Sequence, residues 1–291
     1  MSYRIEKSEA LSDALGRIAA EEIALALAQL RRRNRAKAMH NTRKSLKRLR
    51  SLLRSLRVAF PKELFRRENR RLAAAGRKIA PLRDVHAQLR TLGRLGAAAG
   101  PIAEKTERNL RRQEDDFMRN IPALRHAVRQ MLSASRETIA SWPMKKATPA
   151  RLAAGLKRIY KRGRTALKAV RQKRAPEKLH EWRKQTKTLW HGLALIEELG
   201  PEKAGAMAQH AAQLCQALGD DHDLFLVLQA LRQENAGRPA RDYRRLSSLI
   251  SARRARLQKR ALKLGKKIYG QKPGAFERRL EGWLCRKPSK R

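Results

Sequence analysis

Apolar side chains recur every three or four residues along almost the whole chain, a spacing that indicates α-helices rather than strands. Ala, Leu, Arg and Lys dominate, and all four are strong helix formers. Proline and glycine interrupt the pattern and mark helix ends. The pattern predicts an all-α protein with helices over roughly residues 8–33, 36–59, 62–79, 82–98, 102–119, 122–141, 150–173, 176–198, 202–218, 221–235, 239–268 and 273–285.

The segment from Trp142 to Thr148 is the best candidate for a join between two halves. Thr148 followed by Pro149 is typical of a helix N-cap with proline at the first helical position. We predict one domain over residues 1–291, with one half over about 1–143 and the other over about 149–291. Each half is expected to form a bundle of about four main helices.

The same short cationic signature occurs once in each half, at a similar place in each. The two copies are His40-x-x-Arg43-Lys44-x-x-Lys47 and His180-x-x-Arg183-Lys184-x-x-Lys187. Asp84 and Asp223 form a second correspondence at nearly the same offset. Two correspondences at nearly one offset indicate an internal duplication.

Each signature places its four residues in one narrow stripe of a helix, because side chains three, four and seven positions apart return to the same face. Arg54 extends the first stripe to about 21 Å from His40, at a rise of about 1.5 Å per residue. Leucines occupy the opposite side, so the helix has an apolar back and a cationic front. The helix that precedes the second copy carries a further stripe of Lys157, Lys161, Arg164, Lys168 and Arg171.

Like charges stacked at these spacings destabilise a helix. A ligand that neutralises the stripes explains their repetition, and a stripe roughly 20 Å long suits a linear polyanion better than a nucleotide. A merely solvated basic face is the alternative. The formal net charge of +44 favours the same class of partner: nucleic acid, anionic lipid or a phosphate polymer.

The cysteines and the lengths of the apolar runs indicate the cellular compartment. Cys215 and Cys285 are isolated, and their spacing indicates packed or idle thiols in a reducing compartment. No apolar run is long enough for a transmembrane helix, and the N-terminus lacks an apolar signal core. We therefore expect a cytoplasmic protein without a membrane partner. The sequence leaves its oligomeric state open.

His40 and His180 have three interpretations: a contact with phosphate, which we prefer, a structural role, or metal ligation. Neither has a second histidine or a carboxylate at i+3 or i+4, so we predict no metal site. Asp84 and Asp223 are expected to orient an arginine or lysine rather than to act as catalytic bases. The cluster Asp220-Asp221-His222-Asp223 is too tightly spaced for one helix face, which favours a capping or supporting role.

At these residues the chain resembles the conserved histidine α-helical domain (CHAD) family. The resemblance rests on His40 to Arg50, on Tyr160-x-x-x-Arg164, on Leu179 to Lys187, and on the segments around Asp84 and Asp223. It implies two antiparallel four-helix bundles related by a pseudo-twofold axis, with a basic central groove or pore. It also implies binding of inorganic polyphosphate and association with polyphosphate granules.

Together, the stripes and the resemblance predict a non-catalytic polyphosphate-binding protein without a cofactor. The expected contacts are His40, Arg43, Lys44, Lys47, Arg50, Arg54, Lys157, Lys161, Arg164, Lys168, His180, Arg183, Lys184 and Lys187. The first alternative is a protein that binds nucleic acid without sequence preference, although aromatic residues for base stacking are few. The second alternative is an enzyme, either a polyphosphate hydrolase or a metal-dependent phosphatase, but the sequence offers no carboxylate pair at a credible spacing for it.

Overall fold

A computed structural model describes residues 3–96, 100–234 and 241–285, and these residues form helices and turns without a strand. The helices, in chain order, are α1 (Leu11–Gln29), α2 (Arg35–Ser55), α3 (Lys62–Leu95), α4 (Gly100–Arg119), α5 (Ile121–Ile139), the 3₁₀ helix η2 (Met144–Lys146), α6 (Pro149–Gln172), α7 (Pro176–Leu195), the 3₁₀ helix η3 (Glu197–Leu199), α8 (Glu202–Glu234), α9 (Arg241–Tyr269) and α10 (Pro273–Leu284). The all-α prediction is confirmed. The predicted helix ends at 98, 235 and 239 lie outside the described residues.

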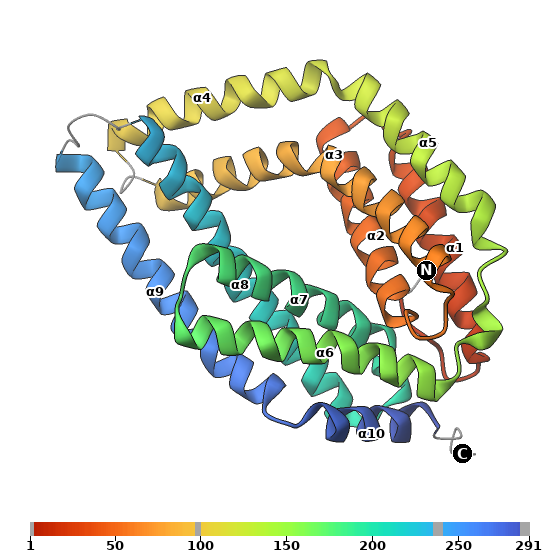
Figure 1. The fold of residues 1–291 in the computed structure, drawn as a ribbon. Helices are drawn as coiled ribbons and strands as arrows, with labels where there is room; N and C mark the ends of the chain where they lie inside the picture. Colours follow the sequence, from red (N-terminus) through yellow and green to blue (C-terminus); the bar gives the residue numbers. More distant parts are fainter. Residues whose placement is uncertain (1–2, 97–99, 235–240, 286–291) are drawn as a thin grey trace.

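Two predicted helix breaks were wrong. Residues 62–79 and 82–98 were expected as separate helices, but α3 continues through Pro81. Residues 202–218 and 221–235 likewise form the single helix α8. Pro81 is exposed, so its ring meets no packed neighbour, and α3 bends along its length (Figure 1). Packing on both sides of each break outweighs the local cost of Pro81 and Gly219.

The helices pack in two groups that follow the two halves of the sequence (Figure 1). In the first group, α1 and α3 each pack against both α2 and α5. In the second, α7 and α9 each pack against both α6 and α8, and α10 covers α6. The groups meet through α2 with α6 and α7, and through α3 with α8. The pseudo-twofold relation between them stays a prediction.

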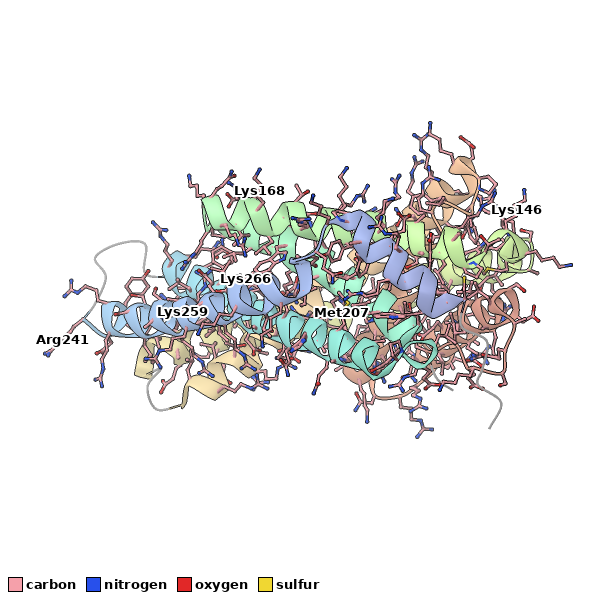
Figure 2. All side chains as sticks on the ribbon, turned by 90° about the horizontal axis from the view of Figure 1, so that it is seen from below. Lys146, Lys168, Met207, Arg241, Lys259 and Lys266 are labelled. Carbon is pink, nitrogen blue, oxygen red and sulfur yellow. The ribbon has the colours of Figure 1, made fainter. Side chains whose placement is uncertain are left out.

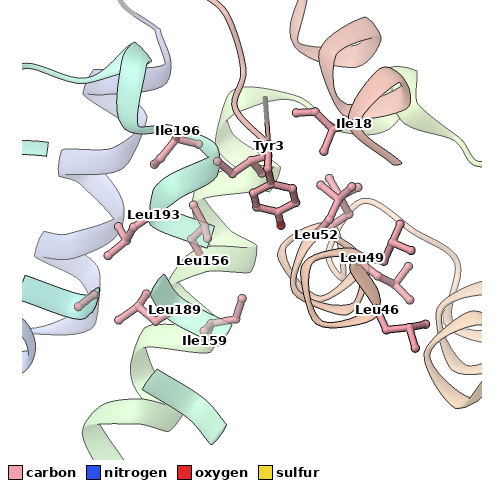
Figure 3. Packing of buried hydrophobic residues seen from close by; sticks show 14 of the residues in the cluster. Tyr3, Ile18, Leu46, Leu49, Leu52, Leu156, Ile159, Leu189, Leu193 and Ile196 are labelled. Atoms are coloured by element: carbon pink, nitrogen blue, oxygen red, sulfur yellow. The ribbon is translucent and has the colours of Figure 1, made fainter. Parts of the chain in front are cut away.

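Two apolar clusters hold the fold together. The larger includes Leu49 of α2, Leu156 of α6 and Leu193 of α7, which are at most 2% exposed. Figure 3 shows Tyr3 between the leucines of α2 and those of α6 and α7. The smaller cluster joins the C-terminal parts of α3 and α8 to α4 and α9. No helix of the described chain is long and apolar enough to cross a membrane.

Small residues bring the two groups into close contact. A Cβ atom on Gly155 of α6 would lie 1.7 Å from the backbone oxygen of Ser55 of α2, so only glycine permits this approach. The Ser51 hydroxyl of α2 donates a hydrogen bond of 2.7 Å to the Thr188 carbonyl of α7. The first contact packs α2 against α6, and the second joins α2 to α7, the other signature helix.

Candidate functional site

The two signatures face one cavity of about 420 Å³ between α2, α3 and α7. Eight lysines and arginines line it, against the single carboxylate of Glu181. The eight are Arg43, Lys47, Arg50, Arg54, Arg77, Arg183, Lys184 and Lys187. The cavity therefore concentrates positive charge from both halves of the chain.

The local sequence explains why these side chains point inward. Asn34 caps α2 by accepting a hydrogen bond from the Lys37 amide, which fixes where the helix begins. On α2, Leu46, Leu49 and Leu53 are buried, as the apolar stripe predicts. On α7, Trp182, Leu189 and Leu193 are buried in the same way. With these faces in the core, the signature stripes are left to face the cavity.

Several arginines are held in place by neutral acceptors. An Arg43 guanidinium nitrogen donates to the Gly76 carbonyl of α3 at 2.9 Å, and one of Arg54 donates to the Thr188 hydroxyl at 3.0 Å. Neither arginine has a salt bridge among the described residues. Since a guanidinium has five donors, each retains free N–H groups for a ligand.

Crowding of these cations changes their proton affinity. Burial, together with Lys187, Arg43 and Arg183, lowers the pKa of Lys47 to about 6. Burial also lowers the pKa of Lys187, and burial with Arg54 lowers that of Arg50 to about 10. A free cavity at neutral pH therefore holds Lys47 largely uncharged.

The two signature histidines occupy different places. His180 lines the main cavity, and its ring lies 4.8 Å from that of His222. His40 instead lines an adjacent space of about 70 Å³ with Arg83, His86 and Arg90. Partial desolvation and the nearby cations lower the pKa of both signature histidines, so both are neutral at pH 7. No group of three possible metal ligands occurs among the described residues.

The paired aspartates orient an arginine, as the sequence predicted. Arg83 forms salt bridges of 3.0 Å with Asp84 and 3.1 Å with Asp223, which joins α3 to α8. In the neighbouring cluster, Asp221 accepts hydrogen bonds from Arg254 and Gln258 of α9. These carboxylates are supporting groups, and Arg83 is positioned near the cavity by two of them.

Five of the predicted contacts lie outside both spaces. Lys44 is exposed beside the main cavity but is not among its lining residues. The α6 stripe lies on the flank of α6 that meets α10, away from the cavity. Lys157 pairs with Glu277 of α10, and Arg164 donates to the Gln271 carbonyl at 2.8 Å. Lys161 and Lys168 are exposed on the outer surface, where Figure 2 labels Lys168.

Three cations near the cavity were not predicted. Arg77 lines it from α3. Burial lowers the pKa of Arg43 and Arg183, and nearby Arg83 lowers it further. Burial also lowers the pKa of Arg54, and Arg162, on the other flank of α6, adds to this shift. Arg77 precedes Asp84 by two helical turns, so both lie on one face of α3, and that spacing was a usable signal.

Comparisons with known proteins agree with this architecture. The family model of the CHAD domain matches residues 9–233. A comparison with curated proteins found no match. The structure of the CHAD domain from the plant Ricinus communis is 18% identical, with a TM-score of 0.59 over 96% of this chain and 94% of that one. PptA from Streptomyces chartreusis is 17% identical, with a TM-score of 0.61 over 90% of this chain and 100% of that one. Because the family model covers most of the sequence, including both signatures, the chain belongs to the CHAD domain family.

Proposed function

We propose that the protein binds inorganic polyphosphate in the cavity between α2, α3 and α7. One observation carries the proposal: eight cationic side chains from both halves line a cavity with a single carboxylate. Such an excess of half-buried and exposed positive charge in one cavity repels itself in the free protein and is relieved by an anion. Association with polyphosphate granules would follow from this binding.

The residue types suit a chain of phosphates. Arginines offer planar pairs of donors to phosphate oxygens, and lysines add compact charges between them. Bound phosphate favours the charged form of Lys47, whose pKa is about 6 in the free cavity. Binding is therefore coupled to proton uptake, and affinity falls as the pH rises above about 6.

We propose binding without hydrolysis. Hydrolysis of phosphoanhydrides needs a metal ion or a base that activates water. Near the cavity, Asp84 and Asp223 are both engaged by Arg83, and Glu181 pairs with Lys184 at 3.3 Å. Shortening of polyphosphate in the presence of Mg²⁺ or Mn²⁺, abolished by Asp223→Ala, would contradict this part of the proposal.

Binding of nucleic acid without sequence preference is the second candidate, supported by the exposed basic surfaces outside the cavity. A DNA duplex is too large for the cavity, because its major groove alone is about 12 Å wide, whereas the whole cavity holds only about 420 Å³. The tryptophans of α7 also give bases no surface on which to stack there, since Trp182 is fully buried and the ring of Trp190 stacks on that of His191 at 4.7 Å.

The test is a titration of polyphosphates of defined length into wild type and the Arg43→Glu/Arg183→Glu variant. We expect affinity to fall by about 10²- to 10⁴-fold, because each lost charged contact is worth about 1.5–3 kcal/mol. Lys7→Glu/Lys62→Glu, which makes the same charge change at exposed sites, serves as the control. Equal losses in the two variants, or displacement of polyphosphate by duplex DNA at equal phosphate concentration, would refute the cavity assignment.

A further inference from the structure

The exposed side of α6 is basic across its whole width. No aspartate or glutamate occurs between Pro149 and Gln172. Lys161 and Lys168 are exposed, and neither has a salt bridge among the described residues. Neither lysine lines the cavity, although both belong to the cationic stripe of α6 that the sequence predicted. Their charge is therefore unexplained by the site described above.

The outer side of α9 repeats this pattern. Its one carboxylate, Asp242, lies in the first turn. Eight of its ten exposed cations lie between Arg245 and Lys267, and no salt bridge of the described residues involves any of the eight. They are Arg245, Arg253, Arg256, Lys259, Arg260, Lys263, Lys266 and Lys267. From Arg245 to Lys267 this array spans about 33 Å, at a rise of about 1.5 Å per residue.

Tertiary contacts hold the two helices together. Gly163 of α6 leaves room for the ring of Tyr269 of α9, which a Cβ there would approach within 2.6 Å, and a Cβ on Gly265 of α9 would lie 3.3 Å from Leu167 of α6. The Tyr160 hydroxyl donates to the Gln271 carbonyl, just beyond the end of α9. Figure 2 shows Lys168, Lys259 and Lys266 along the side of the molecule formed by α6 and α9.

We name Lys161, Lys168, Lys259 and Lys266 the outer basic face. Arg162 lies between this face and the cavity, because it is exposed next to Lys161 on α6, and α6 packs against α2, whose Arg54 lines the cavity. Positive side chains thus continue from the cavity across α6 to α9. A helix is only about 10 Å across, so an extended chain leaving the cavity near Arg54 reaches the outer basic face by crossing one helix.

We infer that the outer basic face is a second phosphate-binding surface, which holds the part of a polyphosphate chain that extends out of the cavity. This inference rests on the proposed function. A chain already held in the cavity presents its free length to the outer basic face at a high effective concentration, so weak contacts suffice. Exposed lysines without a pocket suit such contacts, because they track a charged backbone without selecting one geometry.

The experiment compares tripolyphosphate with a long polyphosphate in wild type and in the variant Lys161→Gln/Lys168→Gln/Lys259→Gln/Lys266→Gln. We expect the variant to bind tripolyphosphate normally but to bind the long polymer about tenfold or more weakly. The salt dependence of long-chain binding, as the slope of log K against log salt, should fall by about 3 for four lost contacts. The matched control replaces four exposed lysines elsewhere by glutamine: Lys7, Lys62, Lys105 and Lys145.

The outcomes separate this inference from the proposed function. If the long polymer loses the same affinity in the control variant, the outer basic face is not a site. If duplex DNA binds this face in the presence of saturating long polyphosphate, its ligand is nucleic acid and the inference is wrong. Failure of wild type to bind either polyphosphate, by contrast, refutes the proposed function itself.

Discussion

The two signature helices carry the same four signature residues in different electrostatic environments. On α7, Glu181 follows His180 and engages Lys184 at 3.3 Å and Gln185 at 2.6 Å. On α2 the matching position holds Asn41, whose amide donates to Gln29. The first copy therefore has no carboxylate of its own. The difference shows that a repeated motif fixes side-chain chemistry, whereas neighbouring residues fix the charge state.

The matching lysines of the two copies, Lys47 and Lys187, are both half-buried among cations. Burial, reinforced by neighbouring cations of which Lys187 acts most strongly, lowers the pKa of Lys47 to about 6. Burial and the neighbouring Arg183 also lower the pKa of Lys187. Four pairs of variants test this comparison, beginning with a close contact between the two halves of the chain.

Gly155→Ala should have the largest effect, because its Cβ would lie 1.7 Å from the Ser55 oxygen and force α2 away from α6. We expect a loss of about 2–3 kcal/mol in the free energy of unfolding. Polyphosphate affinity should fall as well, since the two copies no longer align. Gly93→Ala is the control, because a Cβ there meets nothing within 4 Å. Chemical denaturation measures both, and equal stability of the two variants would contradict the close-contact argument.

Asp223→Asn should destabilise the protein more than Asp84→Asn. The side chain of Asp223 is 11% exposed and that of Asp84 is 38% exposed, although both pair with Arg83. Loss of the buried partner leaves Arg83 poorly compensated, which costs about 2 kcal/mol, against less than about 1 kcal/mol for the exposed one. Urea unfolding at pH 7 distinguishes the two. A larger loss for Asp84→Asn would mean that Arg83 depends on its nearer neighbour.

Lys47→Met should raise the melting temperature by a few degrees at pH 7, and more than Lys187→Met does. The unfolded lysine keeps a pKa near 10.4, whereas the folded one is about 6, so between these values the unfolded state binds more protons. Wild-type stability therefore rises with pH across this window, and the advantage of Lys47→Met shrinks towards pH 10. Scanning calorimetry at pH 7 and pH 10 measures it. An advantage that does not change with pH would show that Lys47 is charged in the folded protein.

Exchanging the residue that follows each histidine should have the smallest effect. Glu181→Asn removes a carboxylate from the cavity, and we expect polyphosphate affinity to rise several-fold. Asn41→Glu adds one to the first copy and should lower affinity by a similar factor. The double variant should return close to wild type if the copies contribute equally. Titration calorimetry at one salt concentration tests all three, and Glu137→Gln, at an exposed site, is the control.

Much of the fold could be predicted from the sequence. Apolar periodicity predicted the helices and their buried faces, because a helix repeats its own pattern regardless of its neighbours. The helix breaks predicted within α3 and α8 were wrong, because distant contacts rather than local residues decided the outcome there. Pro81 and the Gly219 region are local signals for a helix end, and contacts with distant helices outweighed them.

The candidate site could likewise be predicted only in part from the sequence. The order of residues is enough to give α2, α6 and α7 a cationic stripe opposite an apolar one, since each stripe follows from the angle between successive residues on a helix. Packing between distant helices was needed to bring the stripes of α2 and α7 together in a cavity and to leave that of α6 facing outward. The same packing placed Arg77 and Glu181 at the cavity and made Lys47 a weak base. Burial and local charge depend on whichever helices surround a residue, and those helices lie far away in the sequence.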